Sequence, residues 1–298
     1  MSPLLQFPVS GTATARSITC EVITLIYVRG HLRLDAYSPS IGNLLRMWRK
    51  RRRLSQLELS LDAGISQRHL SFIESGRSRP SRETILRLAD QLKVPLREQN
   101  VMLMTSGLAP EFSERPFSSP DMAHTREMVA RMLHAHPYPA LALDRGWNIL
   151  AMNRTVEMLT EGVDPSLLEG EVNALRLTFH PRGLASRILN FHEWREHILG
   201  RLSHDIGLSG DHRLVELLED LRSYPAPETR PASSRPAAPA IAIPLILDSP
   251  DGHLSFLSAT TVFGTAVDVT VSDLVIETFL PADEQTVSAL LRYTPGCG

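Results

Sequence analysis

Apolar residues recur with helical spacing from residue 41 to residue 104. Between residues 41 and 52 they stand at i, i+3, i+4 and i+7, the spacing of a helix that buries one face. Three later apolar patterns each begin after a serine, a residue type that caps helix N-termini: Ser55, Ser66 and Ser81. A further pattern follows Pro95. We therefore predict an all-α domain of five helices over residues 38–108.

A tight turn is expected between the second and third of these helices. Ser55 and Glu58 have the spacing of a capping box. Gly64 follows the second helix, where the chain must turn with a positive φ, and glycine adopts that conformation at the least cost. Ser66 then caps the third helix. The residues expected on the inner face of the second helix are Leu57, Leu61 and Ala63.

Residues 121–292 alternate between helical and strand patterns and predict an α+β domain, joined to the first by a Pro- and Ser-rich linker over 109–120. Helices are expected at 122–135, 153–159, 191–208, 211–223 and 283–292. Strands are expected at 140–144, 147–152, 174–179, 241–247, 253–262 and 274–280. The Asp251-Gly252 pair favours a hairpin turn. The five prolines of residues 225–240 predict a flexible loop.

Charge separates the two predicted domains. The whole chain carries a net charge of −2, but residues 41–98 hold thirteen Lys and Arg against six Asp and Glu, a net charge of +7. The rest of the chain is therefore at −9. A basic module joined to an acidic one is typical of a protein whose one domain binds phosphate groups.

The N-terminal segment and the cysteines indicate a cytoplasmic protein. The apolar run at residues 18–28 is interrupted by Glu21 and falls short of the roughly 20 residues that a membrane span needs. The first charged residue is Arg16, which argues against a secretory signal. We interpret residues 1–37 as a poorly ordered or wrongly assigned extension. Cys20 and Cys297 cannot build a disulfide scaffold or a thiolate zinc site.

The sequence LSQLELSLDAGISQRHLSFIESGRSRPS at residues 54–81 resembles the helix-turn-helix of the phage-repressor-like XRE family. The resemblance implies that Gln56 contacts the phosphate backbone, as do Arg77 and Arg79 in the loop after the third helix. The base-reading positions that it implies are Ser66, Gln67, Arg68 and Ser71.

Physical reasoning on the same residues agrees with these roles. Only the N-terminal residues of a helix that docks end-on into the major groove reach base edges. Gln67 can pair bidentately with adenine and Arg68 with guanine, and we expect Arg51 to contact phosphate. Because one such module touches few bases, we expect a homodimer on palindromic double-stranded DNA. The alternative is a helical bundle whose basic face is merely solvated.

Five stretches of the second domain together resemble the MmyB-like ligand-binding domain that follows an XRE helix-turn-helix in some regulators. They are HPYP at 136–139, LDRGWN at 143–148, NALRLTFHPRGL at 173–184, NFHEWR at 190–195, and PDGHLSF at 250–256 running on to Phe263-Gly264. The resemblance implies a PAS-like fold whose cavity accepts a small, largely apolar effector, with a fatty-acid-like molecule as the family expectation. The proline-rich insert at 225–240 departs from the family pattern.

Eight residues of the second domain are candidates for contact with such an effector. Four could anchor a carboxylate or hydroxyl: Arg176, His180, Asn190 and Arg195. Four could line the cavity: Phe191, Trp194, Phe256 and Phe263. Each also has a purely structural interpretation. Trp194 and Phe256 can be ordinary core aromatics, and Arg176 can be a solvated or ion-paired neighbour.

The sequence contains no catalytic or metal-binding constellation that we can identify. His192 and His197 stand five residues apart, whereas a zincin helix needs an i, i+4 pair on one face. Neither cysteine has a histidine beside it. We therefore expect a DNA-binding transcription regulator that senses a small molecule and needs no cofactor. Two alternatives remain: a regulator whose second domain only dimerises, and an enzyme with an autoregulatory helix-turn-helix.

Overall fold

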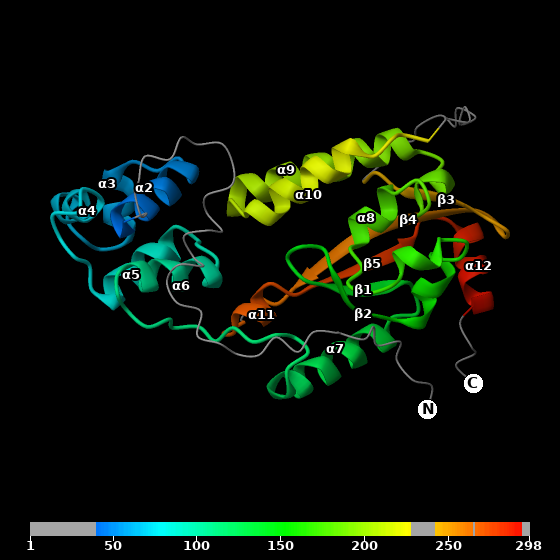
Figure 1. The fold of residues 1–298 in the computed structure, drawn as a ribbon, viewed down its shortest axis with the longest axis horizontal. Coiled ribbons are helices and arrows are strands. Elements are labelled where there is room, and N and C mark those ends of the chain that lie inside the picture. The colour runs from blue at the N-terminus through cyan, green and yellow to red at the C-terminus, as the bar shows by residue number, and fades with distance from the viewer. Residues whose placement is uncertain (1–39, 228–241, 265, 294–298) are drawn as a thin grey trace. The chain divides into compact units, whose positions relative to one another are not determined.

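The computed structural model describes residues 40–227, 242–264 and 266–293, and the chain divides into two units between Glu114 and Arg115 (Figure 1). We refer to residues 40–114 as the first unit and to 115–293 as the second. The predicted extension at 1–37 and most of the predicted loop at 225–240 lie outside the described residues.

The first unit consists of five helices, as the apolar pattern predicts. They are α2 (Ile41–Arg51), α3 (Gln56–Asp62), α4 (Gln67–Glu74), α5 (Arg82–Gln91) and α6 (Leu96–Thr105). Ser55, Ser66 and Ser81 are N-caps, each accepting a hydrogen bond from the backbone N–H three residues on. Ser55 and Glu58 form the predicted capping box. The capping signals in the sequence therefore locate the start of each of these three helices.

The inner face of α3 differs from the prediction. Leu57 and Leu61 are 50% and 70% exposed, whereas Leu59 and Ala63 are buried in the core with Trp48. The physical reason is that leucines at every second position allow two i, i+4 pairs on a helix of only seven residues. The residues that pack against the neighbouring helices are Leu59 and Ala63, so the prediction was wrong for Leu57 and Leu61 and is confirmed for Ala63.

The second unit is built on a five-stranded antiparallel sheet with the strand order β2-β1-β5-β4-β3. Its strands are β1 (Ala140–Leu143), β2 (Ile149–Met152), β3 (Leu245–Ser249), β4 (Gly252–Val262) and β5 (Val275–Pro281). Gly252, with φ of +98°, closes the predicted β3–β4 hairpin. The two longest strands pair from Phe256 opposite Pro281 to Val262 opposite Val275.

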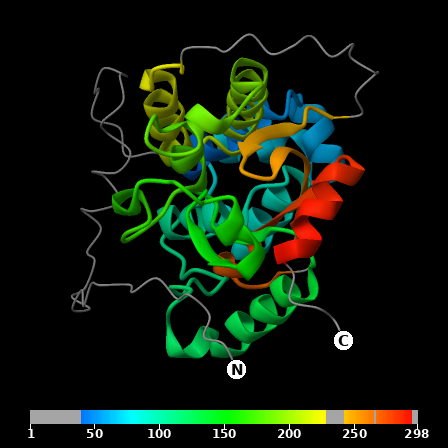
Figure 2. The same cartoon turned by 90° about the vertical axis from the view of Figure 1, so that its right-hand side faces the viewer.

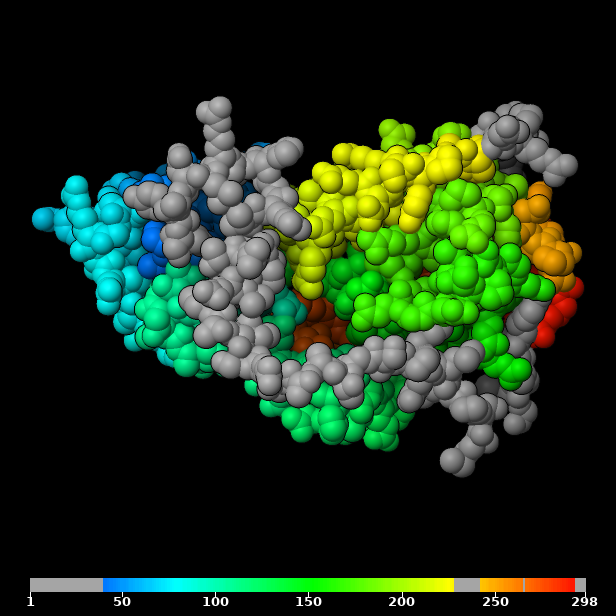
Figure 3. All heavy atoms as spheres, in the orientation of Figure 1, coloured from blue at the N-terminus to red at the C-terminus, as the bar shows by residue number. Residues whose placement is uncertain are grey.

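Helices cover this sheet. They are α7 (Ala123–Ala135), α8 (Ala174–Phe179), α9 (Phe191–Ser209), α10 (His212–Ser223), α11 (Val269–Ser272) and α12 (Glu284–Tyr293). Short 3₁₀ turns occupy Pro120–Met122, Arg154–Met158, Pro165–Leu167 and Ala185–Arg187. The helices α9 and α10 run side by side (Figures 1 and 2) and form a ridge along one side of this unit (Figure 3). The largest core cluster lies between α8, α9, α10, α12 and the strands β3 and β4.

The predicted strand at 174–179 is instead the helix α8. Asn173 caps it by accepting a hydrogen bond from the Arg176 backbone N–H. Leu175, Leu177 and Phe179 are buried and the residues between them are not, so burial does alternate as the sequence pattern indicates. A six-residue segment that packs on two sides shows this alternation on a helical backbone too, which is why the strand prediction failed.

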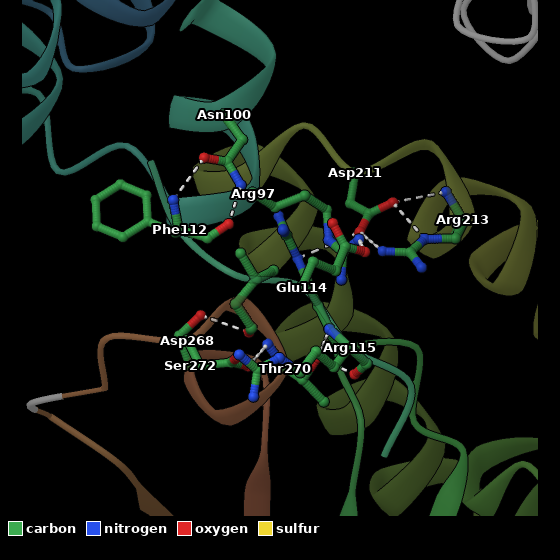
Figure 4. Close-up of polar contacts among 12 residues, drawn as sticks. Arg97, Asn100, Phe112, Glu114, Arg115, Asp211, Arg213, Asp268, Thr270 and Ser272 are labelled. Atoms are coloured by element: carbon green, nitrogen blue, oxygen red, sulfur yellow. Dashed lines mark hydrogen bonds and ion pairs between the residues drawn. The ribbon is translucent and has the colours of Figure 1, made fainter. Parts of the chain in front are cut away.

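The segment predicted as the linker, 109–120, is hydrogen-bonded to the unit on either side of the division. In the first unit, Asn100 of α6 accepts hydrogen bonds from the backbone N–H groups of Glu111 and Phe112, each at 3.0 Å (Figure 4). In the second unit, the Arg115 backbone exchanges two hydrogen bonds with the Thr270 hydroxyl of α11. Each half of the segment is therefore anchored in its own unit.

Candidate functional site

The N-terminal end of α4 carries most of the predicted base-reading residues. Ser66, Gln67 and Arg68 are all exposed there, and Ser71 is half-buried one turn further along. The Ser66 hydroxyl caps the helix by accepting from the His69 backbone N–H at 3.2 Å. The remaining side chains at this end point away from the core, because Leu70 and Ile73 occupy the buried face of the same helix.

Phe72 organises two of the predicted DNA contacts, and sequence reasoning missed it. The guanidinium carbon of Arg68 lies 5.3 Å from the centroid of the Phe72 ring, and that of Arg77 lies 5.9 Å from it. Cation–π contacts of this kind hold a guanidinium over an aromatic face. The signal in the sequence is an arginine and an aromatic residue at i and i+4 on a helix, followed by a second arginine after the turn.

The residues predicted to contact phosphate lie on three different segments. Arg77 and Arg79 are exposed in the loop after α4. Arg51, at the end of α2, has its guanidinium carbon 4.7 Å from the centroid of the Trp48 ring. Gln56, at the start of α3, donates a hydrogen bond from Nε2 to Glu74 at 2.9 Å. A glutamine amide has two N–H donors, so this bond fixes the side chain and leaves one donor for a phosphate oxygen.

Glu74 is a buried hub that joins three helices. Its Oε1 and Oε2 accept a bidentate pair from Arg49 of α2 at 2.7 and 2.8 Å, and Gln56 of α3 donates to the same carboxylate. Arg46 lies 3.4 Å from Oε2 and donates to the Glu74 carbonyl at 2.9 Å. The hub holds α4 against α2 and α3, and so fixes the direction in which the start of α4 points.

The charge state of the Glu74 hub follows from this geometry. Burial by itself raises the pKa of Glu74, but the hydrogen bonds from Arg49, Gln56 and Arg46 outweigh it and leave the pKa below its ordinary value. The hydrogen bond to Glu74 raises the pKa of Arg49. Sequence reasoning treated Glu74 only as one of six acids. The missed signal was a lone carboxylate beside Ile73 on the apolar face of α4.

Three of the four aromatic candidates in the second unit lie in its main core. Phe191, Trp194 and Phe256 are buried in one cluster, with Phe191 edge-to-face against Phe179 at 5.8 Å. Phe263 packs against a different cluster. The indole Nε1 of Trp194 is buried and has no hydrogen-bond partner among the described residues. The structure therefore brings three of these rings together and leaves the fourth elsewhere.

The four polar candidates hold segments of the second unit to one another. Asn190 donates from Nδ2 to the Pro244 carbonyl at 2.8 Å and accepts from the Ile246 backbone N–H at 3.1 Å, which anchors β3. Arg195 donates to the carbonyls of Leu221 and Arg222 at the end of α10. The remaining two contacts are an ion pair of Arg176 with Asp220 at 2.6 Å and an edge contact of His180 with Tyr224 at 5.5 Å.

A surface groove of about 370 Å³ runs along α9 in the second unit. Its lining residues are His192, Arg195, Glu196, Leu199, Gly200, Ser203 and Arg222. Of the eight candidates, only Arg195 lines it. Most of the lining residues are exposed, so the groove is open to solvent and offers a shallow surface rather than an enclosed cavity.

Two family models match the chain. A helix-turn-helix model matches residues 45–99, and the model of the MmyB-like transcription regulator ligand binding domain matches residues 125–292, more than half of the chain. The chain belongs to the MmyB-like transcription regulator family. The search of curated proteins found no match to the chain. Both resemblances inferred from the sequence are thus confirmed, and so is the combination of a helical domain with an α+β domain.

As an MmyB-like regulator, the protein is a DNA-binding transcription regulator with a ligand-binding domain. Within residues 40–227, 242–264 and 266–293, no group of three or more His, Cys, Asp or Glu side chains is arranged to hold a metal ion. In that same part of the chain, we find no helix with the length and apolar content that a membrane crossing requires. The helix-turn-helix match covers residues 45–99, which include the start of α4.

Proposed function

We propose that the first unit binds double-stranded DNA by placing the start of α4 in the major groove. The observation that supports this most directly is the exposed group Ser66, Gln67 and Arg68 at the N-terminus of a helix that the Glu74 hub holds in place. Residues at this end of a recognition helix are the ones that reach base edges. Gln67 then pairs with adenine and Arg68 with guanine, and Ser71 contacts a base edge one helical turn further along α4.

In this proposal phosphate groups on both sides of the groove are bound by a second set of residues. The set consists of Arg51, Gln56, Arg77 and Arg79. Contacts of this kind position the module on the duplex without reading its sequence. One module reads few base pairs, so the protein binds a palindromic site as a homodimer.

The second unit, in the same proposal, binds a small, largely apolar effector of the fatty-acid type. The family match supports a ligand-binding role for this unit. Effector binding then changes the affinity of the dimer for DNA, in the cytoplasm, and the protein has no catalytic activity of its own. If the second unit only dimerises, purified protein will be a bare dimer whose thermal stability no fatty acid changes.

Operator selection from a random duplex library tests the DNA-binding role. With the selected operator in hand, Gln67→Ala and Arg68→Ala should each weaken specific binding by about 1–3 kcal/mol and relax the preference at one base position per half-site. Gln91→Ala is the matched control, because Gln91 is exposed at the end of α5. If Gln67→Ala leaves both affinity and preference unchanged, α4 does not dock in the proposed register.

A further inference from the structure

The turn between β1 and β2 holds an arginine with unused hydrogen-bond donors. Arg145 has a side chain that is 13% exposed, and its Nη1 and Nη2 atoms are buried without a hydrogen-bond partner among the described residues. A guanidinium carries five N–H donors and does not lose its charge in proteins. Burying two of its nitrogens unpaired therefore costs free energy unless an acceptor meets them.

Asp211, the acid nearest to Arg145, is shared with another arginine. The Arg145 Nε lies 3.2 Å from Asp211 Oδ2. Arg213 lies 3.0 Å from the same oxygen with Nη2, and donates to Oδ1 from its backbone N–H at 3.0 Å (Figure 4). The Asp211 carboxylate thus faces two guanidinium groups.

The turn that carries Arg145 is held rigidly. Asp144 accepts hydrogen bonds from the backbone N–H groups of Gly146 and Asn148 at 2.8 and 2.9 Å, and Asn173 donates to the Gly146 carbonyl at 2.7 Å. Trp147 has a φ of +67°, a left-handed conformation that a bulky residue adopts only when its surroundings impose it. Such a turn presents the guanidinium in one orientation, which lowers the cost of binding a ligand.

The surroundings favour an anion of single charge. Asp211 lies beside Arg145, and Asp211, Asp144 and Asp273 all act on the neighbouring Arg213 and raise its pKa. These carboxylates would repel a phosphate dianion more strongly than a monoanion. A carboxylate is planar and matches two guanidinium nitrogens with parallel hydrogen bonds. The Trp147 ring packs against the apolar clusters of the second unit, with Arg201 4.8 Å from its centroid, so apolar surface adjoins the turn.

We propose that Arg145 binds the carboxylate of an organic monocarboxylic acid through Nη1 and Nη2, next to Trp147. This inference rests on the proposed effector binding by the second unit and adds the chemistry of the effector's headgroup. Arg145 is not among the eight effector-contact candidates that the sequence analysis named. The residue carries the assignment because its donors are buried, oriented and unpaired within the described part of the chain.

Calorimetric titration of the full-length protein with octanoate and with 1-octanol tests the assignment. Arg145→Met should weaken octanoate binding by about 10- to 100-fold and leave octanol binding unchanged, because only the acid can accept from the guanidinium. Arg182→Met is the charge-matched control: Arg182 is 63% exposed and ion-paired with Asp164, so both probes should bind as to the wild type. The melting temperature of ligand-free Arg145→Met should stay close to that of the wild type, because Arg213 still pairs with Asp211 when Arg145 is removed.

Two results would overturn the inference while leaving effector binding intact. One is octanoate affinity that Arg145→Met does not change. The other is that Arg145→Met weakens octanoate and octanol binding by the same factor and lowers the melting temperature. That result would make Arg145 a structural ion-pair partner of Asp211. If the wild-type protein binds neither probe, the carboxylate assignment fails. If, in addition, no fatty acid shifts its melting temperature, the proposed effector binding fails with it.

Discussion

Glu74 shows how one buried residue controls the geometry of the proposed DNA interface. Its carboxylate receives hydrogen bonds from α2 and α3, and its pKa lies below the ordinary value in the folded chain. A group with a depressed folded pKa adds stability above its unfolded pKa, and this stability is lost as pH falls through the folded pKa. We therefore expect the first unit to be uniformly stable above about pH 5 and to weaken progressively in more acidic solution.

The Glu74→Gln variant tests the hub directly. It removes one partner of a buried, bidentate ion pair and leaves Arg49 without a carboxylate, a change that costs about 3–5 kcal/mol. Hydrogen exchange of the amides of α2 and α4 would report the loss in the first unit alone. Glu83→Gln is the control, because Glu83 is 84% exposed in its pair with Arg87 and should change stability by less than about 1 kcal/mol.

Arg77 is suited to a test of the phosphate contacts. Each phosphate that an arginine neutralises releases condensed counterions, so Arg77→Ala should reduce the slope of log K against log salt by about one. It should also weaken binding to operator and random duplex by the same factor. Arg87→Ala makes the same charge change on α5 and should leave the slope nearly unaltered. Equal slopes for the two variants would mean that Arg77 makes no phosphate contact.

At the scale of elements, capping signals locate helices better than apolar periodicity does in short segments. The serine caps fixed the starts of α3, α4 and α5, because a hydroxyl that accepts an N–H is a local interaction. The sequence could not show which face of α3 is buried or that α8 is a helix. These segments have only seven and six residues, and so short an apolar pattern fits more than one period. Only tertiary packing decides between such alternatives.

Replacing Gly42 tests how the packing of α2 against α4 contributes to stability. A Cβ built there would lie 2.5 Å from the Ile73 carbonyl oxygen and 2.8 Å from that of Glu74, so α2 could not approach α4 as it does. We expect Gly42→Ala to destabilise the first unit by about 1–3 kcal/mol, although alanine is the better helix former. Urea unfolding followed by hydrogen exchange would measure this.

Gly200→Ala is the matched comparison for Gly42→Ala. Gly200 lies within α9, and a Cβ there would meet no atom within 4 Å. The substitution should therefore stabilise the second unit by about 0.5–1 kcal/mol. If Gly42→Ala and Gly200→Ala change the free energy of unfolding in the same direction, the close approach of α2 and α4 does not determine the effect at Gly42.

At the scale of the whole molecule, charge and family patterns predicted the division into a basic helical unit and an acidic α+β unit. The residues that organise each site were harder to see. Glu74 and Phe72 act through partners on other segments, and the unpaired donors of Arg145 depend on the fold around the turn. The predicted cavity aromatics illustrate the same limit, because Trp194 and Phe256 occupy the core whether or not a ligand touches them.

Effector binding and DNA binding, if coupled as proposed, must obey thermodynamic reciprocity. The factor by which an effector changes operator affinity has to equal the factor by which operator changes effector affinity. Moving the protein from about 1% to about 99% in one state requires roughly 10⁴-fold tighter effector binding to that state. Fluorescence anisotropy of labelled operator with and without saturating octanoate gives one factor, and calorimetry of octanoate with and without operator gives the other. Two equal factors different from one are expected. Factors of one in both measurements would leave the second unit as a dimerisation domain, since a ligand with equal affinity for both states cannot shift their populations.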